Sequence, residues 1–306
     1  MISYLLFNKI LQLAVIMLFG FLLVKLKVIK SCDSTVLSKI SLYLLMPAAL
    51  LNAFDVEVTP QVVKGLALSF GAGISLHFIL LGMDWLYKKI FKGTEVERAS
   101  VMYSNAANLI IPLVSYVLGG EWVIYCCAFM SVQIVFLWTH AIRLFSSQKL
   151  DIKKIVFNTN IIAIVVGVIL LLSGLRLPAF VKEITSSLGS MIGAMGMLIA
   201  GMLATTVNLK QTLVNKRFYL VVAMRMLVYP VVMLCILKCV LWVINFADAD
   251  KILLVSYLAS ITPPAATIMQ FAQINNKDAD FAVAVNIVST ILCIATMPLF
   301  VWCFGL

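Results

Sequence analysis

The feature that most constrains this chain is a series of long apolar segments separated by short polar ones. Roughly 20 apolar residues in a helix cross a bilayer core of about 30 Å. Of the 306 residues, 63% are hydrophobic and 12% are charged, and the mean hydropathy of +1.09 exceeds what one water-soluble core requires. We therefore predict an all-α integral membrane protein with ten transmembrane helices, at approximately residues 4–24, 36–54, 62–83, 99–118, 121–142, 155–175, 186–207, 218–244, 252–273 and 279–304.

The basic residues are distributed unevenly between the predicted loops. Most of the 23 lysines and arginines follow the first, third, fifth, seventh and ninth spans. Because cytoplasmic loops are enriched in Lys and Arg, these loops are predicted to be cytoplasmic and both termini extracytoplasmic, with the protein in the cell (inner) membrane. A net charge of +10 would suggest nucleic acid in a soluble protein, but here the cations fall in alternate loops between membrane spans. The lipid bilayer is therefore a predicted partner, and no nucleic-acid partner is predicted.

The spans divide into two equal groups. Five precede the basic loop SSQKLDIKK, residues 146–154, and five follow it. An odd number of spans in each half inserts the second half upside down relative to the first. Inverted repeats are the plan of many secondary transporters, whose substrates bind near the bilayer centre on helices interrupted at corresponding positions. We therefore predict two inverted five-helix repeats.

The fourth span of each half contains residues that interrupt a helix. These are SNAANLIIPLVSYVL, residues 104–118, and SITPPAATIMQFAQ, residues 260–273. Proline removes a backbone donor and clashes with the preceding turn, so each helix is predicted to unwind at its proline. Each new N-terminus would direct unpaired amides at the bilayer centre, where they favour an anion. The alternative is that the prolines only kink packed helices. The predicted substrate-binding residues in the two breaks are Asn105, Asn108, Pro112, Thr262, Pro263 and Pro264.

Three segments carry more specific motifs: GFLLVKLKVIKSCDSTVLSKISLYLLMPAALLNAF at residues 20–54, NAANLIIPL at residues 105–113, and ASITPPAATIMQFAQINNKDADFAVAVNIVSTILCIATMPLF at residues 259–300. Together they resemble the auxin efflux carrier family, whose bacterial members include malate-permease-like proteins. The resemblance implies a fold related to the bile-acid sodium symporters, in which broken helices four and nine cross.

The same resemblance implies that the helices form two units, a scaffold and a mobile transport unit. Helices one, two, six and seven would form a scaffold, residues 1–57 and 151–210. Helices three to five and eight to ten would form a mobile transport unit, residues 58–150 and 211–306. It further implies a homodimer and elevator-type movement of organic anions.

Three further polar residues fall inside predicted spans. Arg225 lies roughly 10 Å into span eight at the helical rise of about 1.5 Å per residue, and so deep a cation faces a cavity or a partner. It is predicted either to attract an anionic substrate, or to snorkel to the headgroups or cap the carbonyls of a neighbouring helix. Gln133 and Asn286 are predicted to line the cavity around the crossing helices, with hydrogen bonding between helices as the alternative.

Protonatable side chains also occur in the inner halves of spans three and five. His77, Asp84 and His140 are the candidates for proton coupling, which would require one of them to change charge during transport. The alternative is that Asp84 and His140 are solvated near the interface. No acidic residue is predicted at the bilayer centre, so sodium coupling is not supported. The seven cysteines show no metal-binding spacing, and neither a metal site nor a cofactor is predicted.

The sequence thus predicts a secondary active or facilitative transporter of small organic anions, such as auxin-like or dicarboxylic acids. An enzyme is not predicted, because there is no HExxH motif and no pair of carboxylates within the spans. A ligand-binding receptor or sensor and a channel remain as alternatives. The short loops disfavour a receptor, and two polar breaks suit a carrier site better than a continuous pore.

Overall fold

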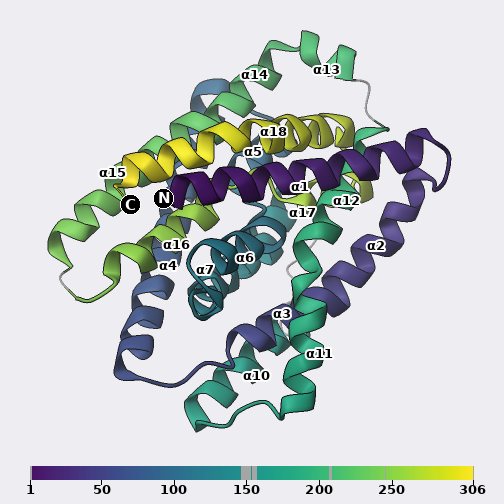
Figure 1. Cartoon of the computed structure of the whole chain (residues 1–306). Helices are drawn as coiled ribbons and strands as arrows, with labels where there is room; N and C mark the ends of the chain where they lie inside the picture. Colours follow the sequence, from purple (N-terminus) through teal and green to yellow (C-terminus); the bar gives the residue numbers. More distant parts are fainter. Residues whose placement is uncertain (1, 146–152, 154–156, 207–208, 245, 306) are drawn as a thin grey trace.

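The computed structural model describes residues 2–145, 153, 157–206, 209–244 and 246–305, and these residues form helices with a single isolated β-bridge. Within them, seven segments are long and apolar enough to cross a membrane: Tyr4–Lys25, Ser31–Ala53, Pro60–Phe91, Gly120–Phe145, Ala179–Ala204, Lys216–Val243 and Ala279–Phe304. Helix α10 (Thr159–Ser173) is apolar but shorter. The prediction of an all-helical, multi-pass membrane protein is confirmed (Figure 1). Most of the basic loop at 146–154 lies outside the described residues.

Only some of these segments are single helices. Helices α1 (Ile2–Lys25), α4 (Pro60–Phe91) and α18 (Ala279–Phe304) are continuous. The others join two helices end to end: α2 (Ser34–Ile40) with α3 (Met46–Ala53), α7 (Val123–Phe136) with α8 (Ile142–Phe145), α11 (Ala179–Ser190) with α12 (Ile192–Ala204), and α14 (Lys216–Ala223) with α15 (Tyr229–Val243). The short helix α13 (Leu209–Val214) precedes α14.

Three of these joints are π-helical turns, at Ser41–Leu45, Leu137–Ala141 and Met224–Val228. Two of the turns are followed by a proline near the start of the next helix, Pro47 in α3 and Pro230 in α15. Proline has no N–H to donate to the preceding turn, so a wider turn there sacrifices little. π-turns within α-helices are frequent at functional positions.

Two further segments are broken in the middle. Helix α5 (Glu95–Met102) is followed by α6 (Ala106–Val117), and α16 (Ala249–Ile261) by α17 (Ala266–Ile274). Residues 103–105 and 262–265 between them are non-helical. The second break contains Pro263 and Pro264, as predicted.

The expectation that the first break lies at Pro112 is wrong, because Pro112 lies inside α6 and the chain unwinds before that helix begins. A proline within a helix removes one hydrogen bond, and α6 tolerates that loss. The chain opens instead where its backbone groups find partners in the other break: Asn105 N donates to Pro263 O at 2.7 Å, and Ala265 N donates to Tyr103 O at 2.9 Å.

One group of helices packs through small residues. Helix α1 lies along α12, and α3 packs against α10 and α11. A Cβ added at Gly201 of α12 would lie 1.9 Å from Met17 O, and one at Gly20 of α1 would lie 2.3 Å from Leu198 O. Because glycine has no side chain, the two backbones approach closely. This group contains the segments predicted as the scaffold.

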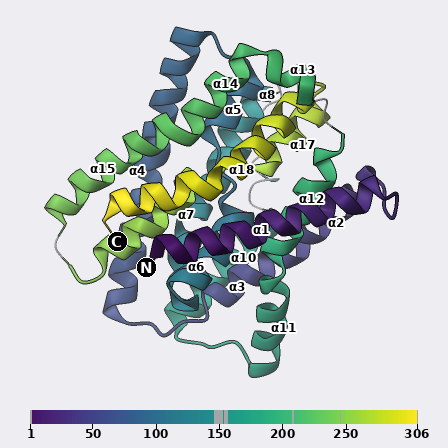
Figure 2. The ribbon, with the colours of Figure 1, turned by 45° about the horizontal axis from the view of Figure 1, so that its top comes forward.

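The two terminal helices lie side by side. Helix α1 packs against α18, and α1 begins at the end of the molecule where α18 finishes (Figures 1 and 2). Helices α5, α6, α16 and α17 lie among the other helices, so the two breaks fall in the interior.

Candidate functional site

The two breaks form one structure at the centre of the protein. Ser104 and Pro264 pair as an isolated antiparallel β-bridge, flanked by the two backbone hydrogen bonds given above. Each break is also held by a side-chain amide from a neighbouring helix. Gln133 Nε2 on α7 donates to Ser104 O at 2.8 Å, and its Oε1 accepts from the Ser104 hydroxyl. Asn286 Nδ2 on α18 donates to Pro264 O.

Arg225 also holds the crossing, through backbone carbonyls. Its side chain is 1% exposed. Nη1 donates to Val101 O of α5 at 3.1 Å, Nη2 donates to Ser260 O of α16 at 2.8 Å, and Nε donates to Thr262 O at 2.9 Å. The last carbonyls of a helix lack partners and carry its negative dipole end. Arg225 therefore caps both half-helices that lead into the breaks, which was the alternative to direct substrate contact.

A cavity of about 260 Å³ borders the crossing. It is lined by residues of the breaks, by the amides that hold them, and by Ser41 and Asn160. Its remaining walls are mainly apolar and aromatic, with Met130, Trp138 and Phe271 among them. The lining residues that the structure describes are all neutral. Such a cavity admits a small organic molecule whose polar end meets the breaks.

Two helix N-termini meet at this cavity. Asn105 precedes α6, while Ala265, Ala266 and Thr267 open α17, and all four line the cavity. Neither helix has a side-chain N-cap hydrogen bond. The first amides of a helix have no intrahelical acceptor, and the positive dipole end lies there. The arrangement favours a negatively charged group.

The predicted site residues do not all reach this cavity. Asn105, Gln133 and Asn286 line it, whereas Arg225 is absent from its lining. The Asn108 side chain lies outside the described residues. Pro112 lines a second cavity instead.

The three remaining predicted residues build the second break. Thr262 is fully buried and donates to Ala259 O at 3.3 Å. Pro263 and Pro264 contribute carbonyls to the hydrogen bonds of the crossing.

Several cavity residues escaped sequence reasoning, and three polar ones are instructive. Ser104 lies one position before the predicted asparagines, and Ser41 lies in a π-turn that no periodicity indicates. Asn160 lies in the first turn of α10, where a polar residue reads as an ordinary helix start. Asn158 Oδ1 does accept from Asn160 N at 2.9 Å, as in such a start. The packing of α10 against α3, α7 and the π-turn at Ser41–Leu45 brings Asn160 to the cavity.

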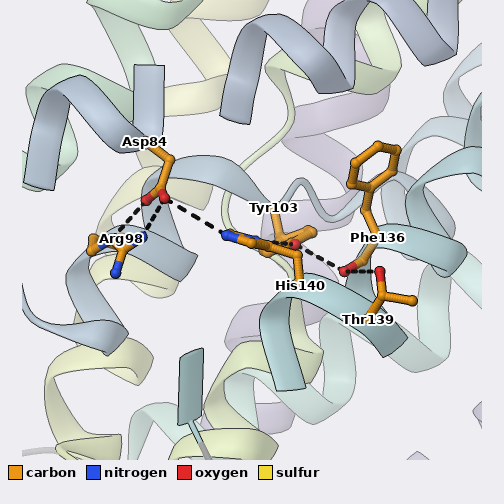
Figure 3. Close-up of polar contacts among 6 residues, drawn as sticks. All are labelled: Asp84, Arg98, Tyr103, Phe136, Thr139 and His140. Atoms are coloured by element: carbon orange, nitrogen blue, oxygen red, sulfur yellow. Dashed lines mark hydrogen bonds and ion pairs between the residues drawn. The ribbon is translucent and has the colours of Figure 1, made fainter. Parts of the chain in front are cut away.

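Two of the predicted protonatable residues belong to a polar chain that reaches the crossing (Figure 3). Arg98 Nε donates to Asp84 Oδ1 at 2.9 Å, and His140 Nε2 lies 3.7 Å from Asp84 Oδ2. Tyr103 OH lies 2.9 Å from His140 Nδ1 and donates to Phe136 O at 3.0 Å. Tyr103 is the first residue of the break, and its carbonyl accepts from Ala265. The interpretation of Asp84 as a solvated interface residue is wrong, because its side chain is 4% exposed and ion-paired.

His77 stands apart from this chain. Its ring stacks on Phe136 and tilts against Phe129, each at 5.0 Å between centroids. Nδ1 is 2.7 Å from Gly73 O in its own helix, and Nε2 has no hydrogen-bond partner among the described residues. The structure therefore brings Asp84 and His140 together and leaves His77 in an aromatic cluster.

A second cavity, of about 410 Å³, lies between the start of α1, the end of α3, α6 and α11. Its lining includes Lys9, Asn52, Pro112, Tyr116 and Ser186. Both cavities touch the segments Ser31–Ala53 and Ala179–Ala204, the first at Ser38–Met46 and Gly196–Ala200, and the second at Ala49–Ala53 and Ser186–Ser190. They lie at different levels along the same two segments.

Comparison with known proteins bears on the whole chain. A family model described as "Membrane transport protein" matches residues 5–155 and again residues 144–301. A search of curated proteins found no match. The matched family contains the auxin efflux carriers and malate-permease-like transporters, and its members are transporters rather than enzymes. The chain therefore belongs to the membrane transport protein family, as the resemblance of its sequence implied.

Proposed function

We propose that this membrane transporter carries small organic anions, which bind with a carboxylate at the crossing of the two breaks. The observation that carries the proposal is the meeting of two helix N-termini at a neutral cavity of about 260 Å³. The amides and dipole ends would hold the carboxylate. The apolar and aromatic walls would hold the remainder of the acid, auxin-like or dicarboxylic.

We also propose the ten-helix, inverted-repeat fold. The seven long segments, α10 and the two broken pairs supply its ten spans. The antiparallel pairing of the breaks supports the inversion, as does the use of an amide from the following segment to hold each one. Residues 1–57 and 151–210 would then be the scaffold, and residues 58–150 and 211–306 the transport unit.

The ion pairs support an elevator movement of one unit against the other. Asp84 pairs with Arg98 and Glu97 with Arg217, both within the proposed transport unit. Asp55 pairs with Lys182 within the proposed scaffold. The two cavities would be the two access routes, since they border the same boundary at different levels. A homodimer in the cell membrane with extracytoplasmic termini follows from the family likeness and the positive-inside rule.

Proton coupling through His140 is part of this proposal. The Phe136 carbonyl can only accept, so Tyr103 OH donates to it and His140 Nδ1–H donates to Tyr103. His140 Nε2 then carries a proton only when the ring is charged, and that charge faces Asp84. The positive charges of Arg98 and Arg143 also lie near His140 and repel a charged ring. Because Tyr103 also belongs to the crossing, protonation of His140 would act on the break that holds the substrate.

The test is counterflow of labelled organic acids into proteoliposomes, with and without a pH gradient. Wild type should accumulate label against unlabelled internal acid. Asn105→Leu should reduce exchange by about tenfold or more, the equivalent of one hydrogen bond to a charged group. Asn8→Leu, a change on α1 at a residue that lines neither cavity, is the matched control.

The outcomes separate the alternatives. Label that equilibrates without accumulating indicates a channel, and acid binding without exchange indicates a receptor. Undiminished exchange in Asn105→Leu would place the site elsewhere. Proton coupling predicts that a pH gradient drives uptake in wild type and not in His140→Gln, which should still exchange at equal pH.

A further inference from the structure

Lys9 is the one charged residue that lines either cavity, among the residues that the structure describes. It lies within the span Tyr4–Lys25, about 10 Å along α1 from Ile2 at the helical rise of about 1.5 Å per residue. The residue is half-buried, and its Nζ lies 5.1 Å from the centroid of the Tyr116 ring on α6. Ionisable side chains within transmembrane segments are rare and commonly mark the path of a substrate or ion.

The ammonium group of Lys9 has no anionic partner. It forms neither an ion pair nor a hydrogen bond with the described residues, and the Tyr116 ring is its recorded contact. Lys182, Lys251 and Lys277, by contrast, each pair with a carboxylate. An ammonium has three donors, and the face of an aromatic ring satisfies its charge only in part. An anion in the second cavity would therefore find a cation without a competing carboxylate.

The second cavity has the size and the lining for a small acid. Its volume is about 410 Å³, and its walls combine apolar residues with the polar residues Asn52, Ser115 and Ser186. The lining residues that the structure describes include no carboxylate. A cavity lined by charge of one sign raises the local concentration of small ions of the opposite sign. The second cavity therefore favours an organic anion.

Helix α6 connects this cavity with the crossing of the two breaks. The helix begins at the crossing with Ala106, and Ile111, about 8 Å further along it, is its first residue in the lining of the cavity. Lys9 lies in a segment of the proposed scaffold, whereas Tyr116 lies in the proposed transport unit. Their contact therefore spans the boundary between the two units, and movement of the transport unit would change it.

We propose that Lys9 binds the carboxylate of the transported acid in the second cavity, in exchange for the Tyr116 ring. The inference rests on the proposed transport function and gives the two access routes different electrostatics. In the first cavity the acid meets neutral side chains and helix N-termini, and in the second it meets a lysine. Because the proposed orientation places the termini outside the cell, Lys9 would serve the extracytoplasmic side.

The first experiment measures the charge of the second cavity and does not need transport. Ser186→Cys places a thiol at an exposed lining residue of α11. Its modification by anionic sulfonatoethyl methanethiosulfonate is compared with that by neutral methyl methanethiosulfonate, and peptide mass spectrometry separates this thiol from the native cysteines. Adding Lys9→Gln should lower the ratio of the anionic to the neutral rate by about twofold or more, because a nearby positive charge is lost. An unchanged ratio would overturn the proposal.

Lys25→Gln is the matched control for this and the following measurements. Lys25 lies on the same helix and holds its Nζ 5.5 Å from the centroid of the Phe21 ring, but it lines neither cavity. The rate ratio should therefore be the same with and without Lys25→Gln. A ratio that falls equally in both lysine variants would reflect the overall charge of the protein and would overturn the assignment to Lys9.

The same thiol reports whether an acid binds in the cavity. Phenylacetate and malate are the acid probes, with phenylacetamide as a neutral analogue and chloride as an inorganic anion. At least one acid should slow modification by the neutral reagent, and Lys9→Gln should raise the concentration required by about tenfold, the equivalent of one hydrogen bond to a charged group. Absence of protection by both acids, or equal protection by phenylacetamide or chloride, would overturn the proposal.

Transport of the more protective acid distinguishes this proposal from the transport function. In oriented proteoliposomes, Lys9→Gln should raise the KM from the side of the second cavity by about tenfold relative to the KM from the other side. Lys9→Arg keeps the charge and should stay near wild type. Higher ionic strength should raise the same KM ratio in wild type more than in Lys9→Gln, because salt screens the attraction.

The outcomes of the two experiments are independent. A lysine that only extends to the lipid headgroups would leave the KM ratio unchanged in Lys9→Gln, and that result would overturn the proposal while the transport function stands. Protection by an acid that depends on Lys9, without any transport in wild type, would refute the transport function and leave the anion site at Lys9 standing.

Discussion

At the scale of single residues, Arg225 shows how a buried charge can be structural in a membrane protein. Its guanidinium donates to carbonyls from two different helices, α5 and α16, at the ends that lead into the breaks. A planar cation with several donors suits such a position, because it satisfies several carbonyls at once and complements two negative dipole ends. In this arrangement Arg225 holds the crossing in shape.

Replacing Arg225 should therefore destabilise the protein before it changes affinity. We expect Arg225→Met to leave three carbonyls unsatisfied, at roughly 1–3 kcal/mol each, and Arg225→Lys to lose less. Thermal unfolding in detergent should rank wild type above Arg225→Lys and Arg225→Met lowest. Arg143→Met, at an exposed arginine on α8, is the control and should change little. Weakened acid binding with unchanged stability in Arg225→Lys would show instead that Arg225 contacts the substrate.

At the scale of elements, the contact between α1 and α12 depends on the absence of side chains. Gly20 and Gly201 bring each helix within van der Waals distance of the other's backbone. Without a strong hydrophobic force between helices in lipid, close packing of this kind holds membrane helices together. The contact between α1 and α12 is thus a close-packed interface within the proposed scaffold.

Two glycine substitutions should have opposite effects. Gly201→Ala places a methyl group 1.9 Å from Met17 O, so the helices must separate, and we expect a loss of about 1–3 kcal/mol or more. Gly71→Ala on α4 meets no atom within 4 Å and should be neutral or stabilising by about 0.5–1 kcal/mol. Unfolding temperatures of the two variants would check this. Equal stability of Gly201→Ala and wild type would mean that the α1–α12 interface accommodates the extra methyl group.

At the scale of the whole molecule, one carboxylate joins segments from the two halves of the chain. Asp55, in the loop after α3, lies 2.7 Å from Lys182 Nζ and 3.7 Å from Arg176 Nη1, and it accepts from Leu177 N at 3.2 Å. Burial opposes ionisation of Asp55. The hydrogen bonds to Lys182 and Leu177 and the two cations outweigh burial, so the pKa of Asp55 lies below its ordinary value of 3.8.

This lowered pKa predicts how stability depends on pH. The stabilisation by Asp55 is complete above the unfolded-state pKa of 3.8 and is lost as the pH falls through the lower pKa of the folded state. Asp55→Asn should cost about 1–2 kcal/mol at neutral pH, and the difference from wild type should shrink below about pH 4. Thermal unfolding of both proteins between pH 3 and pH 7 measures it. A difference independent of pH would show that Asp55 stabilises through its shape and not its charge.

The sequence by itself determined the class of the protein and where one break lies. Apolar runs long enough to cross a bilayer leave helices as the main option, because backbone groups in lipid must be satisfied within the segment. Pro263 and Pro264 have no backbone N–H, so two successive hydrogen-bond donors are missing. The local sequence therefore predicts the second break by itself. The paired amides Gln133 and Asn286 could also be singled out, because polar side chains in apolar spans need partners.

Tertiary structure alone decided the rest of the site. The first break lies at residues 103–105 rather than at Pro112 because Tyr103 and Asn105 find backbone partners about 160 residues away, in the other break. Asp84 is buried because Arg98 reaches it, and Asn160 lines the cavity because α10 packs on α3. Local sequence encodes the cost of leaving a polar group without a partner. Which distant group removes that cost is settled only when the helices pack.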